Sequence, residues 1–332
     1  MGNNILYENL ALSGGGAKGI TFIGALRKLQ EDGILQNMTR FAGSSAGALC
    51  AACLACNGSL DQIDGFLRDI DPSMFNDHGC GGIVRKVYNI FRHNGVYKTD
   101  KLYQWCQDSI EKLTGNKDIT FEEVFLRYNH ELVITGTLMN PKSGETVYFS
   151  RHTGFENMKI CQAMIISISI PFYFFSYKYQ DGVYSDGGLL DYIPLHIFDR
   201  KLFSGNDCNN IKSLGISLQQ LTHTEEISPP YYQELIKKNN KPSTFFNFVS
   251  RTINSIYSHA QWSYEETFDA ERIIQVYTPN ISLLDFDLST KTQNTLIEQG
   301  YQETTKYLLN RSKNLKTSKK IKKKRRKEKH FK

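Results

Sequence analysis

A serine between two glycines is the first feature of this sequence that could do chemistry. Gly43, Ser45 and Gly47 form a Gly-x-Ser-x-Gly pattern that leads into small and apolar residues. The pattern is typical of a nucleophile elbow, in which a strand turns sharply into a helix and exposes the serine hydroxyl. Such a hydroxyl can attack a carbonyl carbon when a base removes its proton. Because the pattern is short, the interpretation of Ser45 depends on the motifs around it.

A glycine-rich loop precedes this serine in the chain. Residues 10–13 read as the end of a buried strand, Gly-Gly-Gly-Ala-Lys-Gly follows at residues 14–19, and an amphipathic helix comes next. Consecutive glycines let the backbone approach a ligand, and amides at a helix start carry partial positive charge. The loop is therefore suited to an anion. Two interpretations of Lys18 are open: phosphate binding, or a solvated charge at the helix start.

An aspartate on a tight turn is the third feature. Asp186, Gly187 and Gly188 follow the strand-like residues 181–185, so a carboxylate stands at the end of a strand. An unperturbed aspartate has a pKa of about 3.9 and is a weak base at neutral pH. If Asp186 serves as the base, partial burial and a direct hydrogen bond to the serine hydroxyl must compensate for this.

The order of glycine loop, serine elbow and aspartate turn resembles the patatin-like phospholipase family, over about residues 9–200. Two smaller matches support it: Ser-Ile-Ser-Ile-Pro at residues 167–171, and the proline that ends residues 186–194. The resemblance implies an α/β, patatin-like three-layer fold at residues 8–200, with helices flanking a central, mostly parallel sheet. It also implies a lipid acyl hydrolase, similar to phospholipase A or a lysophospholipase, that cleaves carboxylic esters without a metal or other cofactor.

The resemblance further implies a role for individual residues. Ser45 is the expected nucleophile and Asp186 its base, with no histidine between them. Backbone amides form the expected oxyanion hole, at Gly14, Gly15, Gly16 and Ala46. The remaining motif positions are expected to support the turns: Lys18, Gly19, Gly43, Gly47, Gly187 and Gly188. Many family members carry asparagine where this chain has Asp191, and we interpret Asp191 as a residue that shapes the turn.

Three other functions are compatible with parts of the sequence. Residues 14–19 match a dinucleotide-binding pattern, but the acidic residue expected at the end of the next strand is absent because that strand leads into Ser45. A catalytically silent protein could bind lipid or nucleic acid through a basic tail. An α/β-hydrolase-type esterase would combine Ser45 and Asp186 with a histidine, and the candidates are His196, His223 and His259.

Charge is distributed unevenly along the 332 residues. Residues 311–332 hold 13 of the 40 basic residues and one of the 34 acidic residues, so this tail carries about +12 and the remainder about −6. Such a self-repelling segment is expected to be disordered. It could contact anionic lipid, nucleic acid or a nuclear-import factor, or it could only aid solubility. Residues 201–310 are expected to form an α-rich extension that packs on the catalytic domain.

The segments between the motifs supply the elements that would position them. Strand, glycine loop, helix, strand, elbow and helix form a βαβα unit, which predicts a parallel sheet. Asp100 and Thr120 are expected to cap helices. The apolar and aromatic residues 83–91 could cover the site, touch a bilayer or form a buried helix. We expect strands at 5–12, 38–42, 131–139, 145–150, 181–185, 211–218 and 272–277, and helices at 17–31, 45–56, 60–70, 101–113, 159–167, within 243–270 and at 289–309.

Cysteine content and hydropathy favour an intracellular protein. The seven cysteines are an odd number, and the first residues lack a secretory signal, so a reducing compartment is expected. Cys50, Cys53 and Cys56 lie on the helix after the elbow, where small packing residues explain them better than zinc ligands. No apolar run reaches the length of about 20 residues that a membrane span requires. We expect a cytoplasmic protein that is peripheral at membranes, with nuclear targeting by the tail as a further option.

Overall fold

The central sheet begins with the two strands that the early βαβα pattern predicts. β1 (Asn9–Leu12) and β2 (Arg40–Gly43) pair in parallel, with Leu10 opposite Phe41. β9 (Ser213–Gln220) pairs in parallel with the other side of β1, and β10 (Ile273–Thr278) pairs with β9. This computed structural model describes residues 6–70, 82–204, 211–220, 248, 251–253, 255–257, 271–279 and 281–330.

The other half of the sheet changes from parallel to antiparallel pairing. β4 (Glu131–Met139) is parallel to β2, whereas β8 (Gly182–Asp186) runs antiparallel to β4 and β7 (Tyr177–Tyr179) antiparallel to β8. β5 (Gly144–Phe149) forms the predicted antiparallel pair with β4. The resulting order is β10-β9-β1-β2-β4-β8-β7, which confirms a mostly parallel central sheet. β3 (Gly95–Tyr97) and β6 (Phe172–Phe174) form a separate parallel ribbon.

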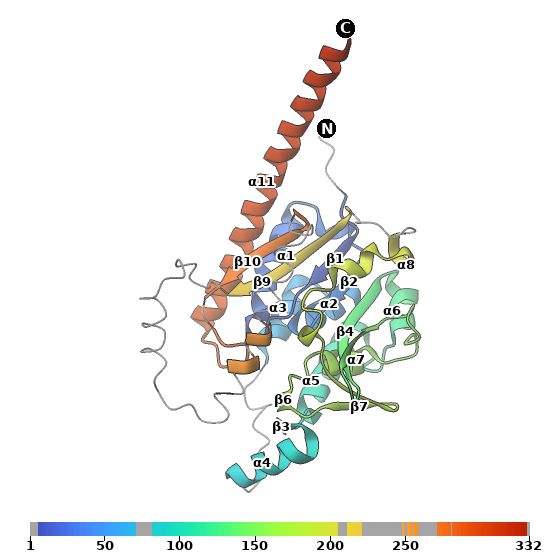
Figure 1. The fold of residues 1–332 in the computed structure, drawn as a ribbon, viewed down its shortest axis with the longest axis vertical. Helices are drawn as coiled ribbons and strands as arrows, with labels where there is room; N and C mark the ends of the chain where they lie inside the picture. The colour runs from blue at the N-terminus through green and yellow to red at the C-terminus, as the bar shows by residue number, and fades with distance from the viewer. Residues whose placement is uncertain are drawn as a thin grey trace.

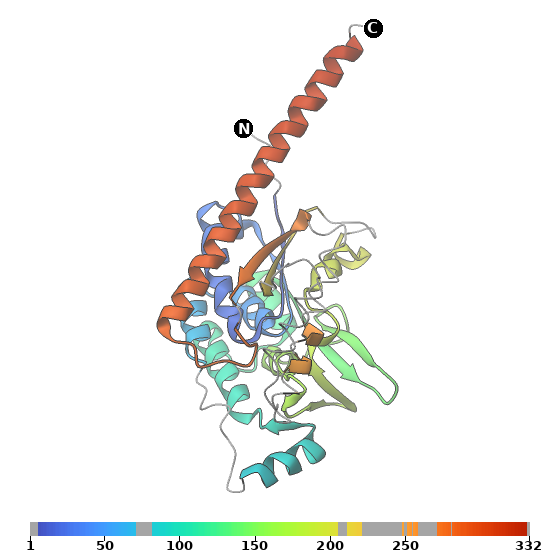
Figure 2. The same cartoon turned by 60° about the vertical axis from the view of Figure 1, so that its left-hand side comes forward.

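Helices cover the sheet, as Figures 1 and 2 show. They are α1 (Thr21–Glu31), α2 (Ala46–Ala55), α3 (Leu60–Arg68), α4 (Gly82–His93), α5 (Asp100–Thr114), α6 (Phe121–Tyr128), α7 (Ile160–Ser167), α8 (Lys201–Ser204) and α11 (Thr290–His330). The short 3-10 helices are η1 (Gly16–Ile20), η2 (Leu35–Asn37), η4 (Gly187–Leu189) and η5 (Pro194–Asp199). Within the described ranges, none of these helices combines the length and apolar content that a bilayer span requires.

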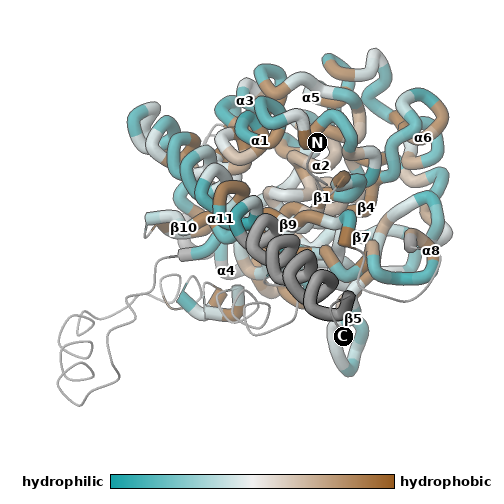
Figure 3. Tube along the Cα trace, turned by 90° about the horizontal axis from the view of Figure 1, so that it is seen from above, coloured by the Kyte–Doolittle hydropathy of each residue, from teal (hydrophilic) through white to brown (hydrophobic). Residues whose placement is uncertain are grey.

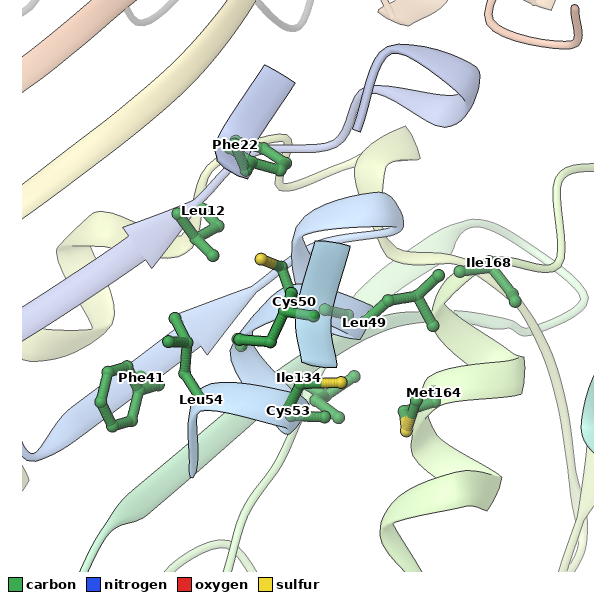
Figure 4. Packing of buried hydrophobic residues seen from close by; sticks show 14 of the residues in the cluster. Leu12, Phe22, Phe41, Leu49, Cys50, Cys53, Leu54, Ile134, Met164 and Ile168 are labelled. Carbon is green, nitrogen blue, oxygen red and sulfur yellow. The ribbon is translucent and has the colours of Figure 1, made fainter. Parts of the chain in front are cut away.

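Both faces of the sheet are buried at the parallel strands β1 and β2. Leu10 and Leu12 of β1 point into the larger core, while Ala11 between them belongs to a smaller cluster with η5 and α8 on the opposite face. Helix α2 lies inside the larger core and is buried along its whole length. Its cysteines pack there as expected, and Figure 4 shows Cys50 and Cys53 close to side chains of α1, β4 and α7, namely Phe22, Ile134 and Met164.

Helix caps test two sequence predictions. Thr120 caps α6 as predicted, because its hydroxyl accepts from the Glu123 amide and the Glu123 carboxylate accepts from the Thr120 amide. The prediction for Asp100 is wrong by one residue. Helix α5 begins at Asp100 itself, and its cap is Thr99, whose side chain makes no capping hydrogen bond.

The C-terminal region is part of the central sheet rather than a layer packed on it. β9 and β10 extend the sheet next to β1, and α11 packs along α1. The backbone of α11 continues as helix to His330, which differs from the disorder expected after residue 310. The segment contains many good helix formers and no proline, so the packed first turns can propagate outward. Arg311 still contacts the body, with its guanidinium 5.6 Å from the Tyr7 ring.

Some sequence predictions lie outside the described residues. These are the helical prediction over most of 243–270, the start of the first predicted strand at residue 5, and the positions of His223 and His259.

The crossing of α1 and α11 depends on a glycine. A methyl group at Gly300 would lie 2.1 Å from the carbonyl oxygen of Thr21, which is backbone and cannot move aside. We expect Gly300→Ala to lower the free energy of unfolding by about 1–3 kcal/mol through overpacking, as measured by urea denaturation. Gly65→Ala in α3 is the matched control, since nothing lies within 4 Å of the added carbon. A Gly300→Ala protein as stable as the control would contradict this packing.

Candidate active site

The turn between β2 and α2 has the geometry that the Gly-x-Ser-x-Gly pattern predicts. Ser45 holds a φ of 50° and a ψ of −122°, a conformation that a non-glycine residue rarely adopts. Gly47 makes this turn possible because a methyl group there would lie 2.4 Å from the carbonyl oxygens of Leu12 and Ser13. The elbow therefore packs directly against the end of β1. Gly43 ends β2 on the other side of the serine.

The structure brings the two predicted reactive side chains together. Ser45 Oγ donates a hydrogen bond to Asp186 Oδ2 at 2.8 Å, although the residues are 141 positions apart. Asp186 ends β8, and its Oδ1 accepts from the Gly188 amide at 2.7 Å at the start of η4. Both carboxylate oxygens are thus held, one by the serine hydroxyl and one by the following turn.

A serine segment at the C-terminal end of α7 connects the elbow to the aspartate strand. The Ser167 hydroxyl accepts from the backbone amide of Ser45 at 2.9 Å. The carbonyl oxygen of Ser169 accepts from the backbone amide of Asp186, also at 2.9 Å. These residues belong to the Ser-Ile-Ser-Ile-Pro segment, which the sequence marks as a motif without indicating this bridging position. The segment fixes both reactive residues to one rigid support.

Burial changes the acidity of the aspartate. Asp186 is 0% exposed, and desolvation raises its pKa from the ordinary value of 3.8 to about 7. Hydrogen bonds from Ser45 and Gly188 act in the opposite direction and keep the rise from being larger. A carboxylate with a pKa near 7 is a far better base at neutral pH than an exposed aspartate. The compensation that the sequence argument requires is therefore present.

A tyrosine from the C-terminal region completes the surroundings of the aspartate. Tyr257 is 2% exposed, and its ring packs against Gly188, where an added Cβ would lie 2.7 Å from the ring. Its hydroxyl has no hydrogen bond of ordinary geometry within the described chain. It nevertheless faces the carboxyl of Asp186 closely enough to lower the pKa of that group. Nothing in the local sequence around Tyr257 indicates this position.

The glycine loop supplies candidate donors for an oxyanion, with one correction. The Gly14 amide donates to the carbonyl oxygen of Tyr192 at 2.8 Å, so it is not available and the expectation for Gly14 is wrong. Among the described residues, no acceptor binds the amides of Gly15 and Gly16. The Ala46 amide opens α2 and has no acceptor within the helix. Gly16 and Ala46 line the same pocket as Ser45, whereas Gly15 does not.

Lys18 is buried rather than solvated. Its side chain lies within η1 and is 1% exposed, so the interpretation as a solvated charge is wrong. Burial lowers the pKa of its ammonium group to about 8. Gly19 follows it and faces the methyl group of Ala46, which brings η1 against the start of α2. Phosphate binding by Lys18 stays a prediction.

An apolar pocket opens beside Ser45. The empty space there is about 700 Å³, and this figure includes space open to solvent. Most of its lining side chains are aliphatic or aromatic and come from α3, α5, the segment after α7, β6 and the residues before α11, including Leu67, Trp105, Ile168, Phe174, Phe286 and Leu288.

The described histidines whose contacts are known have partners other than Ser45. His196 Nε2 is 2.8 Å from the Tyr148 hydroxyl and 3.7 Å from Asp191 Oδ2, and the Tyr148 hydroxyl donates to the same Asp191 oxygen. Asp191 is therefore engaged in a separate cluster, while its amide donates to the Gly187 carbonyl in the turn. His196 does not form a triad with Ser45.

The raised pKa of Asp186 makes the stability of the fold depend on pH. A carboxyl whose folded pKa lies above its ordinary value favours folding at low pH, and this contribution is lost as pH rises through about 7. We expect Asp186→Asn to gain stability over the parent between pH 5 and pH 8, by about 3 kcal/mol, because about two pH units separate pH 5 from the folded pKa. Urea denaturation at both pH values measures this.

The control for that measurement is Asp61→Asn, at an aspartate whose side chain is 95% exposed. It reports the effect of removing a carboxylate that stays in solvent. A gain for Asp186→Asn that is equal at the two pH values would contradict the buried, raised-pKa carboxyl.

Comparisons with known proteins agree with this architecture. The sequence pattern of the family described as "Patatin-like phospholipase" matches residues 10–199. The uncharacterised protein R571 of Acanthamoeba polyphaga mimivirus is 26% identical over 307 residues, which cover 91% of this chain and 94% of that protein. Triacylglycerol lipase ptl3 of Schizosaccharomyces pombe is 30% identical over 173 residues, covering 50% of this chain and 33% of that protein.

The same fold is present in a solved structure. The crystal structure of VipD from Legionella pneumophila aligns with a TM-score of 0.57 at 16% identity and covers 92% of this chain and 67% of that chain. Because the family pattern spans more than half of the 332 residues, this chain belongs to the patatin-like phospholipase family.

Proposed function

We propose that this protein is a lipid acyl hydrolase in which Ser45 and Asp186 form a catalytic dyad. The observation that carries the proposal is the 2.8 Å hydrogen bond from Ser45 Oγ to Asp186 Oδ2 at the edge of an apolar pocket. Membership of the patatin-like phospholipase family supports the same chemistry. The similar protein from Schizosaccharomyces pombe is named a triacylglycerol lipase, which is also consistent with an ester of a fatty acid as substrate.

Because the Ser45 hydroxyl donates its hydrogen bond to Asp186, the carboxylate is placed to accept the serine proton during ester hydrolysis. Asp186 takes the proton of the Ser45 hydroxyl as Oγ attacks the carbonyl carbon of the ester, and negative charge develops on the carbonyl oxygen. As the tetrahedral intermediate collapses, the carbon–oxygen bond to the alcohol breaks and Asp186 returns the proton to the departing oxygen. Water then attacks the acyl-serine with Asp186 again as the base, which releases the fatty acid and restores Ser45.

Backbone amides are the proposed donors for the developing charge. Gly16 and Ala46 line the pocket with Ser45, and the Gly15 amide is also without an acceptor in the described chain. Donors held by backbone need no reorganisation during the reaction, and removing one oxyanion donor in other enzymes costs about 3–4 kcal/mol of barrier. Gly14 is excluded from this set because Tyr192 already accepts its hydrogen bond.

The pocket favours the acyl part of the substrate. Aliphatic and aromatic side chains surround the space beside Ser45, so a hydrocarbon chain bound there would leave water with a favourable free energy. Product chromatography on a panel of phospholipids and glycerides distinguishes a phospholipase from a glyceride lipase. Contact of the basic tail with anionic lipid, nucleic acid or an import factor stays a prediction.

The dyad predicts a clear result for the serine. Ser45→Ala removes the nucleophile and should lower fatty-acid release by roughly 10⁴-fold or more, with an unchanged circular dichroism spectrum. Ser44→Ala is the matched control, because the Ser44 hydroxyl is buried and has no hydrogen-bond partner in the described chain. It should keep near-parental activity. Parental activity in Ser45→Ala would refute the proposal that Ser45 is the nucleophile.

The tyrosine beside the dyad predicts a change in the pH profile. Tyr257 lowers the pKa of Asp186, so Tyr257→Phe should raise that pKa and move the acidic limb of kcat/KM to higher pH, by about one pH unit. Tyr192→Phe is the control, since the Tyr192 hydroxyl donates to the Leu218 carbonyl oxygen instead. An unshifted limb in Tyr257→Phe, with activity lost equally at all pH values, would show that the tyrosine serves only packing.

A further inference from the structure

Helix α4 exposes aromatic side chains at one end of the molecule. Phe91 is 86% exposed and Tyr88 is 56% exposed, and Phe172 on the neighbouring strand β6 is 49% exposed. Figures 1 and 2 place α4 and β6 at the end opposite the C-terminus, and Figure 3 colours α4 with both hydrophilic and hydrophobic residues. We call Arg85, Tyr88, Phe91, Arg92 and Phe172 the α4 surface.

The same surface carries an excess of positive charge. Residues 82–99 contain Arg85, Lys86, Arg92 and Lys98 and no aspartate or glutamate, although the chain before residue 311 is acidic overall. Arg85, Tyr88 and Arg92 are spaced three and four positions apart, so they share one side of the helix. Both arginines are exposed. Aromatic residues beside arginines on one helix face are typical of segments that lie at an anionic lipid interface.

Contacts on the inner side of α4 hold this surface in place. Asn89 is buried and donates from Nδ2 to the Val96 carbonyl oxygen at 3.0 Å. The Phe172 amide donates to the Asn94 carbonyl oxygen at 3.1 Å, which joins β6 to the end of α4. The His93 ring stacks on Phe175 with centroids 4.4 Å apart. The exposed aromatic residues therefore stand on an ordered support.

The α4 surface connects directly to the pocket beside Ser45. Phe172 and Phe174 are the two ends of β6, and Phe174 is 2% exposed and lines the pocket. Phe172 adopts a φ of 62°, which is unfavourable for a bulky residue. Both the backbone strain and the exposure of the Phe172 ring lower the stability of the fold. Strained residues of this kind concentrate at functional sites. A three-residue strand thus runs from the exposed aromatic side chains to the wall of the pocket.

From these observations we infer that the α4 surface docks the protein on an anionic phospholipid bilayer. Arg85 and Arg92 contact the headgroup phosphates, while Tyr88, Phe91 and Phe172 enter the boundary between headgroups and acyl chains. An acyl chain leaving the bilayer then passes along β6 toward Ser45. This inference rests on the proposed function for the passage of substrate, but the docking itself does not require catalysis.

Co-sedimentation with vesicles tests the docking. The full chain is mixed with vesicles of ether-linked phosphatidylcholine, with and without ether-linked phosphatidylglycerol, because ether lipids cannot be hydrolysed. The parent should bind the anionic vesicles preferentially, and Arg85→Glu/Arg92→Glu should weaken this binding by about tenfold or more. Phe91→Ser should weaken it by about threefold or more, since an exposed aromatic residue no longer enters the interface.

Matched variants control for surface charge and apolarity elsewhere. Lys112→Glu/Lys142→Glu makes the same charge change at exposed positions on α5 and on the turn before β5. Leu126→Ser changes a residue on α6 that is 71% exposed. Both should bind vesicles far better than the α4 variants. Parental binding by both α4 variants would overturn the inference. A third variant, Lys322→Gln/Lys323→Gln/Lys324→Gln, removes charge from the tail. Loss of binding in this variant alone would assign membrane contact to the tail and would also overturn the inference.

Two further measurements separate the remaining outcomes. Hydrolysis of p-nitrophenyl butyrate, a soluble ester, should be unchanged in the α4 variants, whereas hydrolysis of diacyl vesicles should fall with binding. A parent inactive on both substrates would refute the proposed function while leaving the co-sedimentation result valid. Sedimentation velocity without lipid examines a protein partner: a parental dimer that the α4 variants dissociate would make this surface an interface between copies and overturn the inference.

Discussion

The removal of a carboxylate from water, with no cationic partner among the described residues, is the constraint on which the rest of this structure depends. Asp186 is fully buried, and its neighbours are a serine hydroxyl, a backbone amide and a tyrosine. Such a group is costly to bury, and only well-placed donors offset that cost. A lysine or arginine there would have stabilised the charge and lowered the pKa, which would have made the carboxylate a poor base. The described neighbours are uncharged, so burial raises the pKa of Asp186 at a cost in stability.

Keeping those donors in place requires segments from much of the chain. The elbow after β2 provides Ser45, and the end of β8 provides Asp186. Ser167 at the end of α7 and Ser169 just beyond it hold both. The region beyond residue 200 contributes as well, because Tyr257 packs on Gly188 and the Leu283 carbonyl oxygen accepts from the Ala17 amide in the glycine loop. The geometry is therefore a property of the whole sheet and its connections.

Local chemistry explains which features the sequence predicts. The conformation of the elbow follows from Gly43 and Gly47, the start of α6 from the reciprocal bonds of Thr120 and Glu123, and the β4–β5 pair from the alternating residues on both sides of one turn. Each depends on residues close together in the chain. The family resemblance, confirmed by the match over residues 10–199, adds the pairing of Ser45 with Asp186, which no local signal contains.

The predicted cap of α5 is misplaced by one residue, but other features that the sequence does not predict depend on distant contacts. Burial of Lys18, the bond from the Gly14 amide to Tyr192, and the position of Tyr257 beside Asp186 all depend on contacts between distant segments. The prediction of disorder at the C-terminus comes from composition, because a run of lysines and arginines considered alone indicates disorder. In the structure these residues extend α11, a helix that is already nucleated by its packing on α1.

The position of β9 has a consequence for how the chain can be divided. The family pattern ends at residue 199, but β9 lies beyond it. β9 pairs with the edge of β1 that faces away from β2 and so satisfies the backbone N–H and C=O groups on that edge. A fragment cut at that limit would leave β1 as an open sheet edge in an apolar setting, a template for pairing with other chains. The recognisable motifs are thus contained in a stretch that is not a self-sufficient folding unit.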